Sequence, residues 1–159
     1  EIGVRLVGSE MCIRDRIKAP KVDPATPLPW AVEDPRVVKF TRHIDLGWLR
    51  ILDVKKAMAV RGWDHQGSVT FHVVDPMGYA EGTWRVDVEA PGAPATVTKV
   101  DDSTDAATLD VAALGSLYFG MGRGFSLAAA HRITGTDEQI AAVDRMFSTV
   151  DVAHNISEF

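Results

Sequence analysis

The first candidates for a functional site in this sequence are a glycine-rich stretch, the histidines and one serine. The stretch GMGRG at 120–124 has the glycines of a phosphate-binding loop. It follows a predicted helix, however, whereas the dinucleotide fingerprint follows a strand and opens a helix, so we interpret it as a flexible connector between helices. No Walker motif occurs. The histidines lack HExxH or Cys/His spacing, which argues against a zinc site; they are His43, His65, His72, His131 and His154.

We expect structural roles, and not catalytic ones, for the remaining polar and aromatic candidates. Without a G-x-S-x-G elbow, Ser126 is expected to cap a helix and not to act as a nucleophile. His72, on the polar side of a predicted strand, is expected at the solvent or at a rim. We interpret four aromatic residues as core or interface packing and not as ligand stackers: Trp48, Trp63, Trp84 and Tyr118.

The end of the chain raises a different question. The last residues are AHNISEF, so an acid, Glu158, precedes an apolar ring, Phe159, that carries the free carboxylate. Chain ends are usually unstructured, and on patterning alone Phe159 would cover a hydrophobic groove while Glu158 stays solvated. His154 and Asn155 fit either the lining of a cleft or a turn.

Composition narrows the class of protein. The chain has 159 residues, 46% of them apolar and 25% charged, and no apolar run reaches the length of a membrane span. The net charge of -5 argues against a nucleic-acid partner and favours neutral or cationic ligands. A single cysteine, Cys12, excludes an internal disulfide framework and fits a reducing, cytoplasmic compartment, but it says nothing about redox conditions if the stretch around it, residues 6–16, is foreign to the protein.

The first residues are set aside from the fold. Residues 6–16, LVGSEMCIRDR, show no sustained periodicity and look like a translated sequencing adapter, so residues 1–17 are interpreted as an adapter-derived or disordered arm of a truncated reading frame. Residues 18–33 form a proline-rich linker that is expected to stay extended. The domain proper is predicted at 34–159.

The domain is predicted to be α+β, with a mostly antiparallel sheet of about five strands packed by helices. Asp34 and Pro35 start a short helix through Val38. The apolar run 47–54 is predicted as a strand. Three alternating segments form an antiparallel meander, and a fourth short strand precedes the helices; these four segments are 68–75, 83–89, 95–100 and 107–111.

Helices are predicted from their caps and apolar spacing. Asp53 caps a helix that carries Val54, Ala57, Met58 and Arg61 at helical spacing and stops at Gly62. Asp110 caps the next helix, which runs to about Phe119. A short helix follows around 125–132. The last helix, 136–150, begins with a capping box of Thr136 and Gln139.

A family resemblance extends this interpretation. The strings PLPWAVEDPR, WLRILDVKKAMAVRGW, DPMGYAEGTWRV, TLDVAALGSLYFGM and SLAAAHRI, with the acid-phenylalanine terminus, resemble the C-terminal third of the Eis-type (enhanced intracellular survival) N-acetyltransferases of the GNAT class. That part of the family has a sterol-carrier-protein-like fold. The resemblance covers Pro24 to Phe159.

The resemblance implies a larger enzyme. In the family, two acetyltransferase-fold domains bind acetyl-CoA, the third domain docks on them, an amine of an aminoglycoside, a lysine or a polyamine accepts the acetyl group, and the enzyme is a hexamer. The family's pyrophosphate loop has no match here, and residues 5–10 come closest. Acetyl-CoA is therefore expected on absent domains, no cofactor-binding or metal-binding residue is assigned, and this chain alone is expected to be inactive.

The resemblance also gives the terminus a role. It implies that the α-carboxylate of Phe159 is the general base, which removes a proton from the attacking amine. Glu158 beside it would attract the cationic substrate. The alternative is a stand-alone lipid or acyl-chain binding module, since sterol-carrier-like folds can enclose an apolar tunnel.

Overall fold

The computed structural model describes most of the chain and divides it into two compact units. The described residues are 17–19, 22–42, 44, 47–101, 104–151 and 153–154. One unit contains 1–46 and 154–159, and the other contains 47–153. Of the arm predicted at 1–17, only Ile17 is described.

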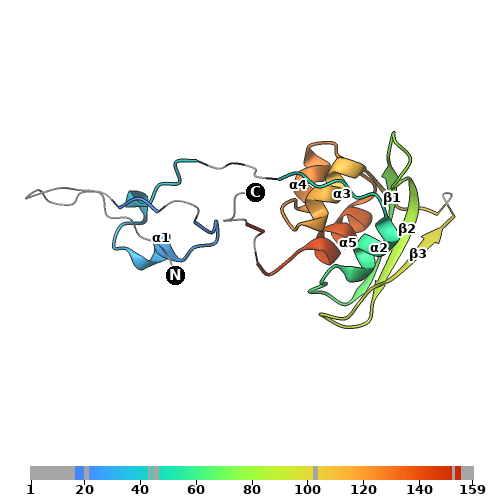
Figure 1. Ribbon diagram of the computed structural model, residues 1–159, viewed down its shortest axis with the longest axis horizontal. Helices are drawn as coiled ribbons and strands as arrows, with labels where there is room; N and C mark the ends of the chain where they lie inside the picture. The colour runs from blue at the N-terminus through green and yellow to red at the C-terminus, as the bar shows by residue number, and fades with distance from the viewer. Residues whose placement is uncertain are drawn as a thin grey trace, which may run out of the picture. The chain divides into compact units, whose positions relative to one another are not determined.

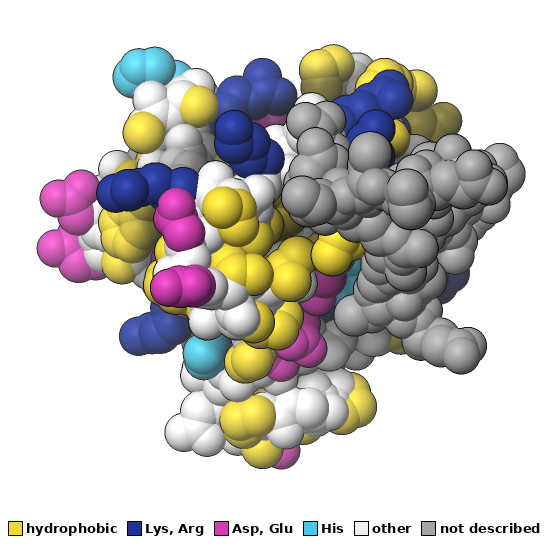
Figure 2. Space-filling model, turned by 90° about the vertical axis from the view of Figure 1, so that its left-hand side faces the viewer, with side chains coloured by type: hydrophobic (Ala, Val, Ile, Leu, Met, Phe, Trp, Pro, Cys, Tyr) yellow, Lys and Arg dark blue, Asp and Glu magenta, His cyan; other side chains and the backbone are white. Residues whose placement is uncertain are grey.

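The first unit contains two short helical turns, α1 (Leu28–Ala31) and η1 (Pro35–Val37). Asp34 caps η1 through Oδ1, which accepts from Arg36 N at 3.0 Å, so the predicted Asp-Pro start is confirmed. The prediction of an extended linker is wrong over α1. Pro29 lies in its first turn, where the missing N–H has no helical partner in any case. Figure 2 shows one face of the molecule, on which hydrophobic side chains lie among charged ones.

The second unit is built on a five-stranded sheet with the strand order β3-β2-β1-β4-β5. β1 and β4 pair in parallel and all the other neighbours are antiparallel, which confirms the mostly antiparallel α+β fold and the β1-β2-β3 meander. The strands are β1 (Gly67–Val74), β2 (Gly82–Val88), β3 (Thr96–Val100), β4 (Ala107–Asp110) and β5 (Ile133–Thr134).

The first predicted strand is wrong. Residues 47–53 pair with no strand, and the fifth strand is the two-residue β5. The segment instead passes over a helix: a Cβ added to Gly115 would lie 2.9 Å from the carbonyl oxygen of Leu49. Ile51 is buried while Trp48 is 93% exposed, so of the two predicted roles of Trp48, core or interface packing, the core role is wrong and the interface role stays a prediction. A short apolar run does not by itself distinguish a strand from a packed loop.

The core lies between the sheet and its helices, which gather on one side of the strands (Figure 1). On β1, Val69, Phe71 and Val73 are buried and alternate with more exposed residues. Trp63 and Phe71 each pack edge-to-face on Phe147, with ring centroids 5.2 and 5.6 Å apart. The helices are α2 (Val54–Val60), α3 (Val111–Tyr118), α4 (Gly124–Ala129) and α5 (Asp137–Phe147).

Local hydrogen bonds start three of these helices. Asp53 accepts from Lys56 N at 3.0 Å and Asp110 from Ala113 N at 2.7 Å, as predicted. Thr136 and Gln139 form the predicted capping box of α5. The cap predicted at Ser126 is wrong, because α4 begins earlier and Ser126 lies inside it. No described helix is long and apolar enough to cross a membrane.

Candidate functional site

The predicted catalytic terminus cannot be placed in this structure. Glu158, Phe159 and Asn155 lie outside the described residues, so their roles stay predictions. Of the tail, Ser148–Asp151, Ala153 and His154 are described. The exposed His154 places Nδ1 3.8 Å from Asp23 Oδ1 within the first unit. The last well-packed point before the terminus is therefore the end of α5.

A buried arginine contacts the end of α5. Arg61, directly after α2, is 7% exposed and donates from Nη2 to the carbonyl of Phe147 at 2.9 Å and from Nε to that of Tyr118 at 3.1 Å. Its guanidinium also lies 4.5 Å from the Trp63 ring centroid. Burial lowers the pKa of Arg61. The sequence places Arg61 on the buried side of α2, but not its carbonyl partners. An always-charged donor surrounded by carbonyls serves to fix the ends of α3 and α5.

A second polar cluster shapes the turn between β1 and β2. Asp75 is buried, pairs with Arg50, and accepts from Met77 N at 3.0 Å and Ala80 N at 2.9 Å. The Ala80 hydrogen bond first, and then that of Met77 and the charge of Arg50, lower the pKa of Asp75. With its carboxylate committed to this turn, Asp75 has a structural role. The Asp-Pro pair at 75–76 is the sequence signal of the turn.

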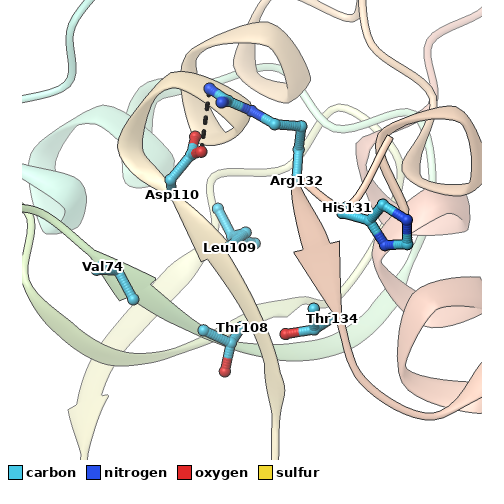
Figure 3. Close-up of a pocket in the computed structure, with 7 residues that line it drawn as sticks. All are labelled: Val74, Thr108, Leu109, Asp110, His131, Arg132 and Thr134. Carbon is cyan, nitrogen blue, oxygen red and sulfur yellow. Dashed lines mark ion pairs between the residues drawn. The ribbon is translucent and has the colours of Figure 1, made fainter. Parts of the chain in front are cut away.

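A shallow pocket of about 150 Å³ lies where β4 meets β5 (Figure 3). Arg132 reaches across its rim to Asp110, with Nη2 and Oδ2 3.0 Å apart, while the His131 ring points away from this pair. Small-molecule pockets commonly have about 300–1,000 Å³, so this one is too small to hold an aminoglycoside-sized substrate. We assign no substrate to it.

The predicted structural roles of the other candidates can now be compared. The GMGRG stretch connects α3 to α4, as predicted, and α4 is only six residues long. His72 is half-buried, with Nδ1 2.8 Å from Thr83 Oγ1. Trp63 is fully buried, and Trp84 and Tyr118 pack against the core. Among the described residues, no group of three His, Cys, Asp or Glu side chains could hold a metal ion.

The fold matches a known domain family. The model of the sterol carrier protein domain matches residues 54–154, which include the whole sheet and α2 to α5. The chain belongs to the sterol carrier protein domain family.

This sterol carrier protein domain resembles parts of N-acetyltransferases. An uncharacterised N-acetyltransferase from Streptomyces avermitilis is 38% identical over 116 residues, which are 73% of this chain and 27% of the relative. The N-acetyltransferase Eis of Mycobacterium bovis is 33% identical over 120 residues, which are 74% of this chain and 28% of Eis. The domain is thus of the kind found in Eis-type N-acetyltransferases.

Solved structures agree with this assignment. The crystal structure of Eis1 from Mycobacterium abscessus matches 86% of this chain and 34% of its own, with a TM-score of 0.71 and 30% identity. A GCN5-related N-acetyltransferase from Kribbella flavida matches 87% of this chain and 35% of its own, with a TM-score of 0.65 and 25% identity. The chain therefore spans about a third or less of the proteins that it matches.

Proposed function

We propose that this chain is the C-terminal domain of an acetyl-CoA-dependent amine N-acetyltransferase. In this proposal the α-carboxylate of Phe159 is the general base, and Glu158 helps to bind a cationic acceptor. The observation that carries the proposal is the likeness to Eis1, which extends over 86% of this chain and beyond the sterol carrier match at 54–154. Acetyl-CoA would bind to other domains of the parent enzyme.

The proposed chemistry is a proton transfer that precedes acetyl transfer. An amine is protonated near neutral pH and must lose a proton before it attacks a thioester, which a carboxylate within about 3 Å can accept directly or through one water. An ordinary α-carboxyl has a pKa of roughly 3.3–3.7, so it becomes an effective base only where burial raises that pKa. The Phe159 ring would anchor the carboxylate in such an apolar niche.

The acceptor and the assembly belong to the same proposal. The acceptor is an amine of an aminoglycoside, lysine or polyamine, and the chain's net charge of -5 suits a cation. The parent enzyme is proposed to be a cytoplasmic hexamer in which this domain docks on acetyltransferase domains.

The packing of the core favours this function over a lipid module. The rings of Trp63 and Phe71 are buried and both pack edge-to-face on Phe147, so no open tunnel lies between these three side chains. A tunnel at this place would require at least one of these rings to leave its edge-to-face contact.

A chimera tests the proposal. Residues 17–159 replace the matching part of Eis1 from Mycobacterium abscessus, and the release of free CoA thiol is measured with aminoglycoside, lysine and polyamine acceptors. One glycine added after Phe159 moves the carboxylate and should abolish turnover while acetyl-CoA binding stays unchanged. The control, Phe159→Leu, keeps a terminal carboxylate on an apolar side chain and should retain more turnover than the extended chimera. Full activity of the extended chimera would refute the role of Phe159.

A further inference from the structure

The segment that follows α5 is tied to the loop between α2 and β1. Val150 N donates to Asp64 Oδ2 at 2.9 Å, and Ser148 Oγ lies 3.0 Å from His65 Nε2. Asp64 and Val150 are both exposed, so these contacts form at the surface and contribute little to the core. A segment that leaves a helix at the surface is ordinarily free to change direction. Here two neighbouring side chains of one loop hold it.

A glycine of the connector between α3 and α4 also contacts this segment. Gly120, the first glycine of GMGRG, has φ +72°. A Cβ at this position would lie 2.5 Å from Thr149 Oγ1 and 3.0 Å from its Cγ2. Thr149 therefore packs directly on the backbone of the connector between α3 and α4, at a position where only glycine fits both the conformation and the space.

The loop that makes these contacts is itself rigidly held. Arg61 joins it to the last carbonyls of α3 and α5, and Gly92 N donates to the Trp63 carbonyl at 2.8 Å. The Trp63 indole donates to the carbonyl of Met58 at 3.0 Å. The loop thus has a fixed position relative to the end of α5, so its contacts with Ser148 and Val150 also fix the direction of the segment after the helix.

We infer that Asp64, His65 and Gly120 form an exit clamp that sets the direction in which the chain leaves α5, with Asp64 as a positioning residue for the Phe159 carboxylate. The part of this inference that concerns Phe159 rests on the proposed function. The clamp contacts residues 148–150, and in this inference Asp64 acts on the carboxylate only through this segment. It explains why the connector carries a glycine at 120 although no phosphate site is built there.

Chain length gives the size of the expected effect within this proposal. The clamp contacts Ser148, Thr149 and Val150. Nine residues separate Val150 from Phe159, and twelve separate Phe147 from it. The effective concentration of a tethered group falls roughly as the −3/2 power of the tether length, so moving the last held residue from Val150 back to Phe147 would lower it about 1.5-fold. Release should therefore lower the frequency of productive tail placement at least about 1.5-fold.

The first test asks whether the clamp restrains the segment after α5. The exchange rate of the Val150 amide is measured in this chain by rapid hydrogen-exchange NMR. Asp64→Ala removes the acceptor and should accelerate exchange about tenfold, the factor expected for loss of one hydrogen bond to a charged group. Asp64→Asn keeps an acceptor oxygen and should restore most of the protection. The matched control, Asp53→Ala, removes a similar carboxylate-to-amide bond at the start of α2 and should leave Val150 unchanged. Equal Val150 exchange in Asp64→Ala and the wild type would overturn the inference.

The consequence for catalysis is tested in the Eis1 chimera. Asp64→Ala should lower kcat at least about 1.5-fold with the KM for acetyl-CoA unchanged, and Asp64→Asn should restore kcat. A general loss of stability would not be rescued in this way. If tail extension abolishes turnover but Asp64→Ala keeps full kcat, the positioning role is refuted and the proposed function stands. If tail extension has no effect, the proposed function is refuted, whereas the Val150 exchange result still decides whether the clamp exists.

Discussion

Replacing Arg61 by alanine should destabilise the second unit more than any exposed arginine replacement. The guanidinium donates to the carbonyls of Tyr118 and Phe147, which end α3 and α5 and have no donor within their own helices. An unsatisfied buried carbonyl costs about 1–3 kcal/mol, so two cost roughly 2–6 kcal/mol. Relief of the desolvated charge and entry of water offset part of this cost. We expect a net loss of about 2–4 kcal/mol.

Urea unfolding followed by tryptophan fluorescence and circular dichroism measures this loss, because Trp63 is buried beside the guanidinium. Arg61→Lys has a single ammonium that reaches one carbonyl, so its free energy of unfolding should fall by about half as much as that of Arg61→Ala. Arg132→Ala is the matched control: its ion pair with Asp110 is solvent-exposed and should contribute at most about 1 kcal/mol. A free energy of unfolding for Arg61→Ala within about 1 kcal/mol of the wild type would show that the two carbonyls find other partners.

Three further outcomes follow from the packing and charges. The hydrogen bond and charge of Arg123 lower the pKa of Asp144 below its usual 3.8, so its stabilising contribution is present above about pH 4 and is lost as the pH falls further; Asp144→Asn should flatten the decline of urea stability between pH 5 and 2.5. Gly124→Ala would place a Cβ 2.9 Å from the Asp144 backbone and should cost about 1–3 kcal/mol in the same assay, unless α4 shifts away without cost. A fluorescent fatty acid should show no saturable binding to the chain, and saturable micromolar binding would restore the lipid-module function.

Features encoded within a few residues could be predicted from the sequence. The caps at Asp53 and Asp110 and the box of Thr136 with Gln139 depend on side chains that reach amides three residues away. The three strands of the meander follow from alternation, because one face of the sheet is buried. The buried position of Arg61 follows from its spacing along α2.

Features that depend on distant segments could not be predicted. The run 47–53 has the composition of a strand, but it crosses α3 at Gly115, and only that contact shows it to be a packed loop. β5 has two residues, too few for alternation to be detected, and its pairing with β4 joins positions 24 and 26 residues apart. The carbonyls of α3 and α5 that accept from Arg61 lie 57 and 86 residues away. At such sites the sequence identifies the donor side chain, but only the fold determines which acceptor it contacts.

The glycines of GMGRG show why composition misleads about function here. A phosphate loop needs glycines so that backbone amides can approach an anion, but glycines also allow two backbones to approach each other. Gly124 lies against Asp144 within α5, and Gly120 lies against Thr149 just beyond its end. The connector therefore contacts both the body of α5 and the segment that leaves it. Because both contacts would be lost with any larger residue, this motif fixes the axis of the last helix and the exit of the tail, and an anion is not needed to explain it.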